Sequence, residues 1–223
     1  MTPRSRRPSK QRPVDHDAAD AAHRLFLAVP LPAPVQGRVA DLSAALADND
    51  WPVRWVNPTG SHLTLHFLGD TAPERAALLR LALPAVVARH PAFALRTAGL
   101  GVFPNARRPR VIWLGLHGPA HRLEALHRDL GTLLRNTGFP IDDGQFSPHV
   151  TLGRVRDDAG RELAAAIAAR LDNESALADS PLPVSVAEVV LYRSILAKQG
   201  ARYEIVTRCP LAAPPSDPKD AGV

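Results

Sequence analysis

A short pattern occurs twice in this chain: a histidine, an apolar residue, a threonine and a second apolar residue. The copies are HLTL at 62–65 and HVTL at 149–152. Each lies in a stretch that alternates apolar and polar residues, as a half-buried strand does, and each is followed by acidic residues and then a helical pattern. With nine histidines in the chain, one copy has little weight. Two copies in matching surroundings predict two similar halves that face each other.

Strand and helix patterns take turns over the rest of the sequence. Strands are expected at 24–31, 53–56, 61–69, 93–104, 110–116, 148–155, 184–194 and 201–208, and helices at 33–48, about 73–90, 119–137 and 159–171. Thr71 and Glu74 have the spacing of a capping box at the start of the second helix. We therefore predict a bilobal α+β fold, with two pseudo-symmetric lobes whose antiparallel sheets are flanked by helices around a central cleft.

The charge is unevenly distributed. The chain has 27 basic and 22 acidic residues, and five of the basic ones lie in residues 1–12, so the remaining 22 equal the acidic residues in number. We interpret 1–22 as a disordered basic tail, 23–210 as the folded domain and 211–223 as a flexible C-terminal tail. A folded part without net charge does not indicate a general nucleic-acid binder, so any RNA contact must come from local clusters.

Other patterns exclude some classes of protein. No run of 18 apolar residues is present, so we expect no membrane span, and the basic N-terminus has no apolar stretch of a secretory signal behind it. Cys209 is the single cysteine, which excludes disulfides and cysteine zinc sites and favours the cytoplasm. We interpret Cys209, near the end of a late strand, as structural.

The doubled motif has a chemical consequence. On a strand, His62 and Thr64 share one face while the apolar residues point to the other, and the same holds for His149 and Thr151. A neutral imidazole can accept a proton near neutral pH while a protonated one donates. Threonine hydroxyls can donate hydrogen bonds to anionic oxygens. A phosphodiester, especially a strained cyclic one, fits between two such pairs.

Two other interpretations compete with catalysis by these residues. The histidines can be half-buried structural residues of a sheet. A metal site would use His62 and His66, but four residues of strand span about 13 Å, too far for one ion. We expect His66 to be a bystander at the edge of the cleft. His117, His121 and His127 are expected on or near a helix, where they form a solvated face.

At this point the chain resembles a known family. Two His-x-Thr-x motifs on strands define the two-histidine (2H) phosphoesterases, and the sequence looks like the bacterial LigT-like RNA 2′,3′-cyclic phosphodiesterases. The resemblance covers roughly residues 23–211. Its segments are RLFLAVPLP, WVNPTGSHLTLHFLGD, LGVFPNARRPRVIWLGL, FSPHVTLGRV and LYRSILAKQGARYEIVTR.

The resemblance implies a bilobal fold with the active site between the lobes, and neither metal nor cofactor. It makes His62 the proton donor, His149 the proton acceptor, and Thr64 and Thr151 the phosphate ligands. The family reaction opens a 2′,3′-cyclic phosphate at an RNA end to leave a 2′-phosphate. The reverse of this chemistry joins RNA through 2′–5′ bonds, so ligase activity stays open.

Further substrate contacts are less determined by the sequence. Arg154 can neutralise phosphate or form a surface ion pair; Phe26 and Tyr192 can stack on a base or belong to the core. The basic cluster of Arg107, Arg108 and Arg110 can contact an RNA strand or be a solvated turn. RNA ends or small cyclic nucleotides are the expected substrates, without an obligate protein partner. The alternatives are a phosphodiesterase for another small cyclic phosphate, such as an ADP-ribose derivative, and a non-catalytic nucleotide-binding module. For catalysis, the ring nitrogens of His62 and His149 must lie roughly 5–8 Å apart.

Overall fold

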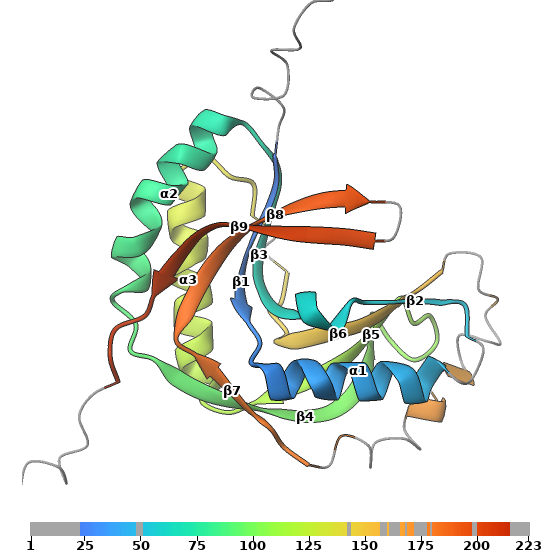
Figure 1. The fold of residues 1–223 in the computed structure, drawn as a ribbon. Helices are drawn as coiled ribbons and strands as arrows, with labels where there is room; N and C mark the ends of the chain where they lie inside the picture. Colours follow the sequence, from blue (N-terminus) through green and yellow to red (C-terminus); the bar gives the residue numbers. More distant parts are fainter. Residues whose placement is uncertain are drawn as a thin grey trace, which may run out of the picture.

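The fold is that of a computed structural model, which describes residues 23–47, 51–141, 144–156, 160, 166–167, 169–171, 178, 180–197 and 200–214 (Figure 1). The predicted N-terminal tail, most of the helix predicted at 159–171 and residues 215–223 lie outside these ranges. At the C-terminal end, Leu211 is buried and Ala212 forms a bridge with Pro91. The chain therefore stays docked on the fold for two residues beyond the boundary expected at 210.

One antiparallel sheet organises the molecule. Its strands are β1 (His23–Pro30), β2 (Val53–Trp55), β3 (His62–Thr71), β4 (Phe93–Phe103), β5 (Val111–His117), β6 (His149–Val155), β7 (Pro183–Val186), β8 (Glu188–Ala197) and β9 (Gly200–Pro210). The order is β7-β4-β5-β6-β3-β1-β8-β9, and β2 pairs with β6 off this path. The helices are α1 (Ala33–Ala47), α2 (Pro73–Val87) and α3 (Ala120–Asn136), with a 3₁₀ turn, η1, at Pro58–Gly60.

The sheet consists of two halves that meet at a single residue pair. Strands β3, β1, β8 and β9 form one half and β6, β5, β4 and β7 the other, and Leu63 of β3 pairs with Val150 of β6 where they join. The chain runs β1–α1–β3 in the first half and β5–α3–β6 in the second, with β1 beside β3 and β5 beside β6. The predicted α+β fold with two pseudo-symmetric antiparallel halves is confirmed, and the two predicted sheets are continuous.

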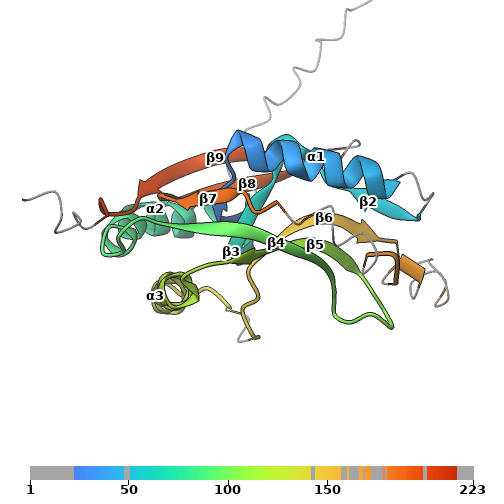
Figure 2. The same cartoon turned by 90° about the horizontal axis from the view of Figure 1, so that it is seen from below.

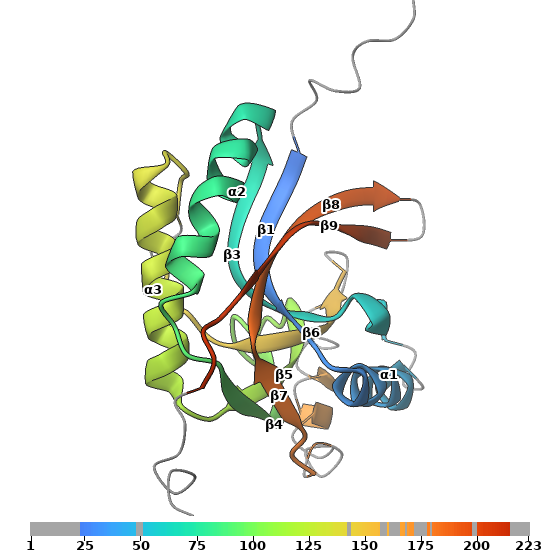
Figure 3. The same ribbon diagram turned by 60° about the vertical axis from the view of Figure 1, so that its left-hand side comes forward.

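Each helix that precedes a motif packs across the join. α1, which follows β1, contacts β6 and β2 of the other half, and α3, which follows β5, contacts β3 and α2. Figures 1 and 3 show α2 and α3 side by side, far from α1. Figure 2 shows how the sheet curls between α1 on one side and the α2–α3 pair on the other. Leu27 and Val29 of β1 and Leu63 of β3 are fully buried on the helix side. This exchange of helices buries the apolar side of both motif strands and fixes the two halves together.

Two local predictions were wrong. The stretch predicted as one strand at 184–194 is divided at Ala187, because β7 pairs with β4 of one half and β8 with β1 and β9 of the other. The predicted capping box does not form: Ala72 is the N-cap of α2, and the Thr71 hydroxyl donates to the Gly69 carbonyl at 3.1 Å. Pro73 begins the helix instead, where its missing N–H costs nothing.

Candidate active site

The join of the two halves brings the two motifs together. Directly opposed residues of antiparallel strands point to the same face, so the fully buried pair Leu63 and Val150 sends its four neighbours to the opposite face. Because the strands run antiparallel, the residues on either side of this pair are aligned across the join, His62 with Thr151 and Thr64 with His149. All four side chains are half-buried. The histidines are thus diagonal neighbours, for which about 7–8 Å between Cα atoms is usual.

Both imidazoles are oriented in the same way. The Nδ1–H of His62 donates to the Gly60 carbonyl at 2.7 Å, and the Nδ1–H of His149 donates to the Ser147 carbonyl at 2.8 Å. Each partner lies two residues before its histidine. Since a carbonyl can only accept, the neutral ring carries its proton on Nδ1, and Nε2 is the nitrogen left for chemistry. The carbonyl two residues before each histidine thus selects the same tautomer in both motifs.

The surroundings of both histidines disfavour their charged forms. Burial is the main cause that lowers the pKa of His62 below its usual 6.5, and the carbonyl of Gly60 opposes it. The charges of His149 and Arg154 lower the pKa of His62 further, so the three groups lie close enough to interact. Burial likewise lowers the pKa of His149, with the Ser147 carbonyl opposing and Arg154 adding to the effect. Proton transfer near neutral pH is therefore within reach of both rings.

Aromatic side chains surround His62. Its ring centroid lies 4.7 Å from that of Phe26, 6.1 Å from that of Tyr192 and 5.1 Å, edge on, from that of Tyr203. Phe26 is only 3% exposed and stacks on Tyr192 at 5.2 Å, so it supports the site from beneath and has no free face for a base. Tyr192 is half-buried and Tyr203 is 36% exposed. Sequence analysis did not identify Tyr203, because its approach to His62 depends on the register of β9.

Phe67 is a second residue that sequence analysis missed. It is 66% exposed, it pairs with Phe26 across β1 and β3, and the two ring centroids lie 6.2 Å apart. It therefore lies on the same face as His62, as a large apolar ring open to solvent. On the other side of the site, His149 meets the edge of Phe103 at 4.9 Å, and Phe103 lies 5.2 Å from Trp113.

A β-bulge lies at the last residue of each motif. In the β1–β3 ladder Leu27 pairs with His66 and Ala28 with Thr64, so Leu65 has no opposite residue. In the β5–β6 ladder the skipped residue is Leu152, since Ile112 pairs with Gly153 and Trp113 with Thr151. Such a bulge reverses the alternation of faces beyond it. Phe67 and Arg154 occupy equivalent places after the two motifs, and both return to the open face.

Two predictions about histidines near the first bulge were wrong, those for His66 and His127. His66 does not lie at the edge of the cleft: it is 6% exposed on the helix face, where its Nε2–H donates to the His127 carbonyl at 2.8 Å. His127 is half-buried and stacks on His66 at 4.0 Å, so it does not belong to a solvated face. His117 and His121 are exposed, as predicted. Periodicity along one strand cannot reveal a residue skipped against its neighbour.

The predicted arginines fall into two groups. Arg154 is exposed on β6 and acts electrostatically on both histidines. Arg107 and Arg108 are exposed in the turn between β4 and β5, and their backbone N–H groups donate to the Asn105 side chain at 3.1 and 3.2 Å. Arg110 is half-buried, and its N–H donates to the Phe103 carbonyl at 2.6 Å. This turn lies directly beyond Phe103, the residue in contact with His149.

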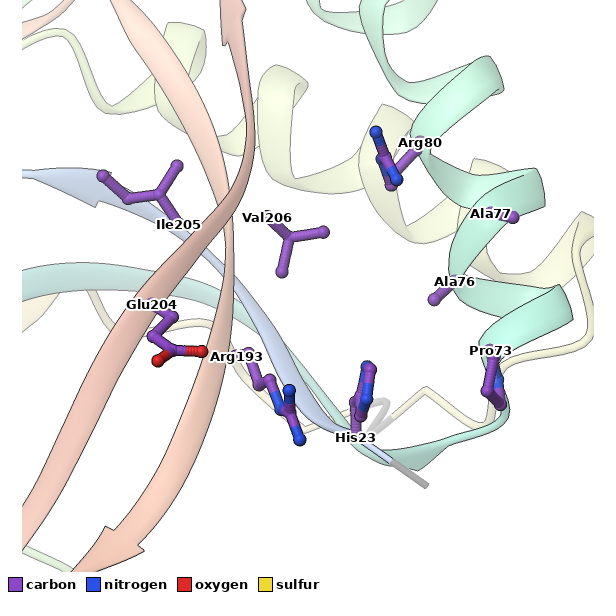
Figure 4. A pocket seen from close by; sticks show the side chains of 9 residues that line it. All are labelled: His23, Pro73, Ala76, Ala77, Arg80, Arg193, Glu204, Ile205 and Val206. Carbon is purple, nitrogen blue, oxygen red and sulfur yellow. The ribbon is translucent and has the colours of Figure 1, made fainter. Parts of the chain in front are cut away.

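A cavity of about 300 Å³ lies elsewhere, between α2 and the strands β1, β8 and β9 (Figure 4). Figure 4 shows His23, Arg193 and Glu204 on the strand side and Pro73, Ala76 and Arg80 on the helix. Arg193 pairs with Leu25, whose side chain faces the helices, so this cavity is on the other face of the sheet from the motifs. None of the four motif residues lines it.

Two further observations concern classes of site. Within the described residues, no three His, Cys, Asp or Glu side chains gather in a way that could hold a metal ion. Among the same residues, no helix is both long and apolar enough to cross a membrane.

Comparisons with known proteins agree with this geometry. The model of the 2′-5′ RNA ligase superfamily matches residues 22–196. An RNA 2′,3′-cyclic phosphodiesterase of Aeropyrum pernix is 32% identical over 168 residues, which is 75% of this chain and 92% of that protein. One of Geobacillus stearothermophilus is 34% identical over 85% of this chain, and this chain spans 58% of that longer protein.

Solved structures give the same picture. The crystal structure of E. coli LigT complexed with 3′-AMP has a TM-score of 0.64 and 26% identity, covering 85% of this chain and 98% of LigT. The structure of TT0787 of Thermus thermophilus has a TM-score of 0.63 and 27% identity, covering 85% and 98%. The two motifs, the joined halves and these matches together show that the chain belongs to the 2′-5′ RNA ligase superfamily, the 2H phosphoesterases.

Proposed function

We propose that this chain is an RNA 2′,3′-cyclic phosphodiesterase that opens a terminal cyclic phosphate to a 2′-phosphate. The observation that carries the proposal is the Leu63–Val150 pair, which sets the two motifs diagonally across one sheet face. Relatives named RNA 2′,3′-cyclic phosphodiesterase align with 75% to 85% of the chain and support the choice of substrate.

In the mechanism we propose, the cyclic phosphate lies between the two imidazoles. Neutral His149 takes a proton from water through Nε2 as the water oxygen attacks phosphorus. Protonated His62 gives its Nε2 proton to the departing 3′ oxygen as the bond from phosphorus to that oxygen breaks. The product is a 2′-phosphate, and the proton taken up by His149 balances the one given by His62.

The remaining roles follow from the same face of the sheet. The hydroxyls of Thr64 and Thr151 donate to the non-bridging oxygens, where negative charge grows in the transition state. Arg154 adds positive charge beside both histidines. We assign Phe67 to stacking on the terminal base, because it offers an open aromatic ring on this face. Tyr192 borders the same surface.

Reversal of these steps joins a 5′-hydroxyl to a cyclic phosphate through a 2′–5′ bond. Hydrolysis is favoured in water because water is in large excess over RNA ends. We also propose a cytoplasmic site of action, since the buried Cys209 is the chain's single cysteine and a reducing compartment needs no disulfide.

The test is to incubate the purified protein with an oligonucleotide that ends in a 2′,3′-cyclic phosphate and to identify the product by phosphorus NMR. We expect a 2′-phosphate, formed with uptake of one water. His149→Ala is the matched control for a contaminating nuclease and should be inactive. A 3′-phosphate product, or no reaction with either an oligonucleotide or a cyclic mononucleotide, would show the proposal to be wrong.

A further inference from the structure

Two arginines face each other beside the motifs. Arg54 of β2 is directly opposite Arg154 of β6, and both side chains are exposed. Opposed residues of an antiparallel pair share a face, and like charges in this position destabilise the pairing. Within the described part of the chain, neither guanidinium has an acidic partner. The fold therefore keeps two adjacent positive charges on the active face at a cost in stability.

The backbone around Arg54 is fixed. The Val56 N–H donates to the Leu152 carbonyl at 3.0 Å, and the Arg156 N–H donates to the Pro52 carbonyl at 2.8 Å. These bonds flank the three residues of β2 and hold the strand against β6. The position of Arg54 is thus determined by the same strand that carries His149 and Thr151.

The distance from the motif suits a second phosphate. Arg154 lies three residues beyond Thr151, about 10 Å along an ideal strand and less here because of the bulge at Leu152. Its charge reaches both His62 and His149. A phosphate between the histidines would therefore have the arginine pair within reach of the next group along a nucleotide chain. Guanidinium groups bind phosphate oxygens in pairs of hydrogen bonds.

We propose that Arg54 and Arg154 together bind the phosphodiester that precedes the terminal nucleotide, so that the enzyme prefers an RNA strand to a cyclic mononucleotide. The inference rests on the proposed function and adds a specificity site to it. Arg54 is the informative residue, because Arg154 also acts on the histidines.

The experiment compares Arg54→Gln with the wild-type protein on two substrates, a cyclic-ended oligonucleotide and a 2′,3′-cyclic mononucleotide. Loss of a charged hydrogen bond should lower kcat/KM for the oligonucleotide about ten- to hundredfold, with the mononucleotide changed less than about twofold. The slope of log KM for the oligonucleotide against log salt should fall by about 0.7. Arg80→Gln, in the cavity on the other sheet face, is the matched control and should change neither substrate.

A modified substrate locates the contact. An oligonucleotide with an uncharged methylphosphonate in place of the last phosphodiester should be a poorer substrate for the wild-type protein, with a smaller loss for Arg54→Gln, in which only Arg154 still binds that phosphate. Equal losses in both proteins would place that phosphate elsewhere and overturn the inference. An equal loss of both substrates in Arg54→Gln would make Arg54 structural. If neither protein turns over any cyclic phosphate, the proposed function fails, and oligonucleotide binding by fluorescence anisotropy still compares the two proteins.

A second inference rests on other contacts, on the helix face behind the motifs. The His127 ring of α3 is sandwiched between two others, with centroids 4.0 Å from His66 and 4.0 Å from Phe146. Burial lowers the pKa of His127 to about 4, and the carbonyl of Leu65, the residue skipped in the β1–β3 ladder, lies close enough to the ring to oppose this lowering. A bulge leaves its extra residue without a ladder partner, and the His127 ring lies beside the backbone of that residue.

Both motif segments therefore touch one side chain. Leu65 is the last residue of the first motif, and Phe146 precedes Ser147, whose carbonyl accepts from Nδ1 of His149. We infer that His127 is a positioning residue that fixes the bulge after Thr64 and the backbone that orients His149. It touches no reacting atom.

The test uses His127→Ala, which removes the central ring of the stack, and Phe146→Leu, which removes one of the outer rings. We expect kcat to fall about tenfold or more with a small change in KM. The Ser147 carbonyl raises the pKa of His149, so its loosening should lower that pKa, measured by NMR titration of labelled histidine. His121→Ala, an exposed histidine on the same helix, is the control. If His127→Ala or Phe146→Leu folds and keeps the wild-type kcat and the wild-type pKa of His149, the inference is overturned. A change in thermal stability alone would give His127 a structural role only.

Discussion

Substitution of Gly153 by alanine tests the close packing behind the second motif. Gly153 is buried at the bulge of β6, opposite Trp55 of β2. A Cβ atom there would lie 2.5 Å from Cγ1 of Val53 and 2.9 Å from Cε3 of Trp55. Carbon atoms do not approach so closely, so the side chains of Val53 and Trp55 must shift, or β2 must move away from β6 with them.

The size of the effect follows from this overlap. Overpacking by one methyl group in a closed site costs about 1–3 kcal/mol. In a domain of this size each 1 kcal/mol lowers Tm by about 2–4 °C, so Gly153→Ala should melt about 2–12 °C below the wild-type protein. Because β2 carries Arg54, turnover of a cyclic-ended oligonucleotide should fall more than turnover of a cyclic mononucleotide.

Differential scanning calorimetry measures the change. Gly37→Ala in α1 is the matched control, since a Cβ there meets no atom within 4 Å and alanine favours a helix, so its Tm should be equal or slightly higher. The double variant Gly153→Ala, Val53→Ala should regain part of the loss, because Val53 is the nearer of the two neighbours. A Gly153→Ala protein with the wild-type Tm and wild-type turnover would refute the reasoning.

Three further predictions concern catalysis and the tail. The plot of kcat/KM against pH should be bell-shaped with its maximum below pH 6.5. One histidine must be protonated while the other is neutral, and burial lowers the pKa of both His62 and His149. A maximum above pH 7.5 would contradict these roles. Activity should survive EDTA, and complete loss that zinc or magnesium restores would remove the two-histidine mechanism. Deletion of residues 1–12, which hold five basic side chains, should weaken RNA binding in gel-shift assays mainly at low salt and leave turnover of a cyclic mononucleotide unchanged. Loss of that turnover would make the tail part of the site.

Much of the fold was predictable because local patterns and long-range packing agree. The alternation around residues 62–65 and 149–152 identified both motif strands and the face that His62, Thr64, His149 and Thr151 share. The duplication predicted two antiparallel halves. Helix spacing located α1, α2 and α3 within a few residues of their ends.

The features that were not predictable depend on pairing between strands. The skipped residue Leu65 turns His66 to the helix face and Phe67 to the open face, and no period along β3 alone contains that information. Ala187 separates β7 from β8 because each pairs with a different half of the sheet. Tyr203 reaches His62 only through the register of β9. The role proposed for Arg54 depends on its pairing with Arg154 of β6, about a hundred positions later in the chain, and the local sequence around Arg54 does not show this pairing.

The assignment of His62 as acid and His149 as base can be measured with one altered substrate. Sulfur in place of the departing 3′ oxygen leaves without a proton, so a substrate with this change has no need of a general acid. We expect His62→Ala to lose about 10²–10⁴ in rate on the ordinary cyclic phosphate and to recover most of it on the sulfur analogue. His149→Ala should be impaired equally on both, because the attacking water still needs a base. Recovery of His149→Ala instead, or equal impairment of both variants on the analogue, would contradict the account.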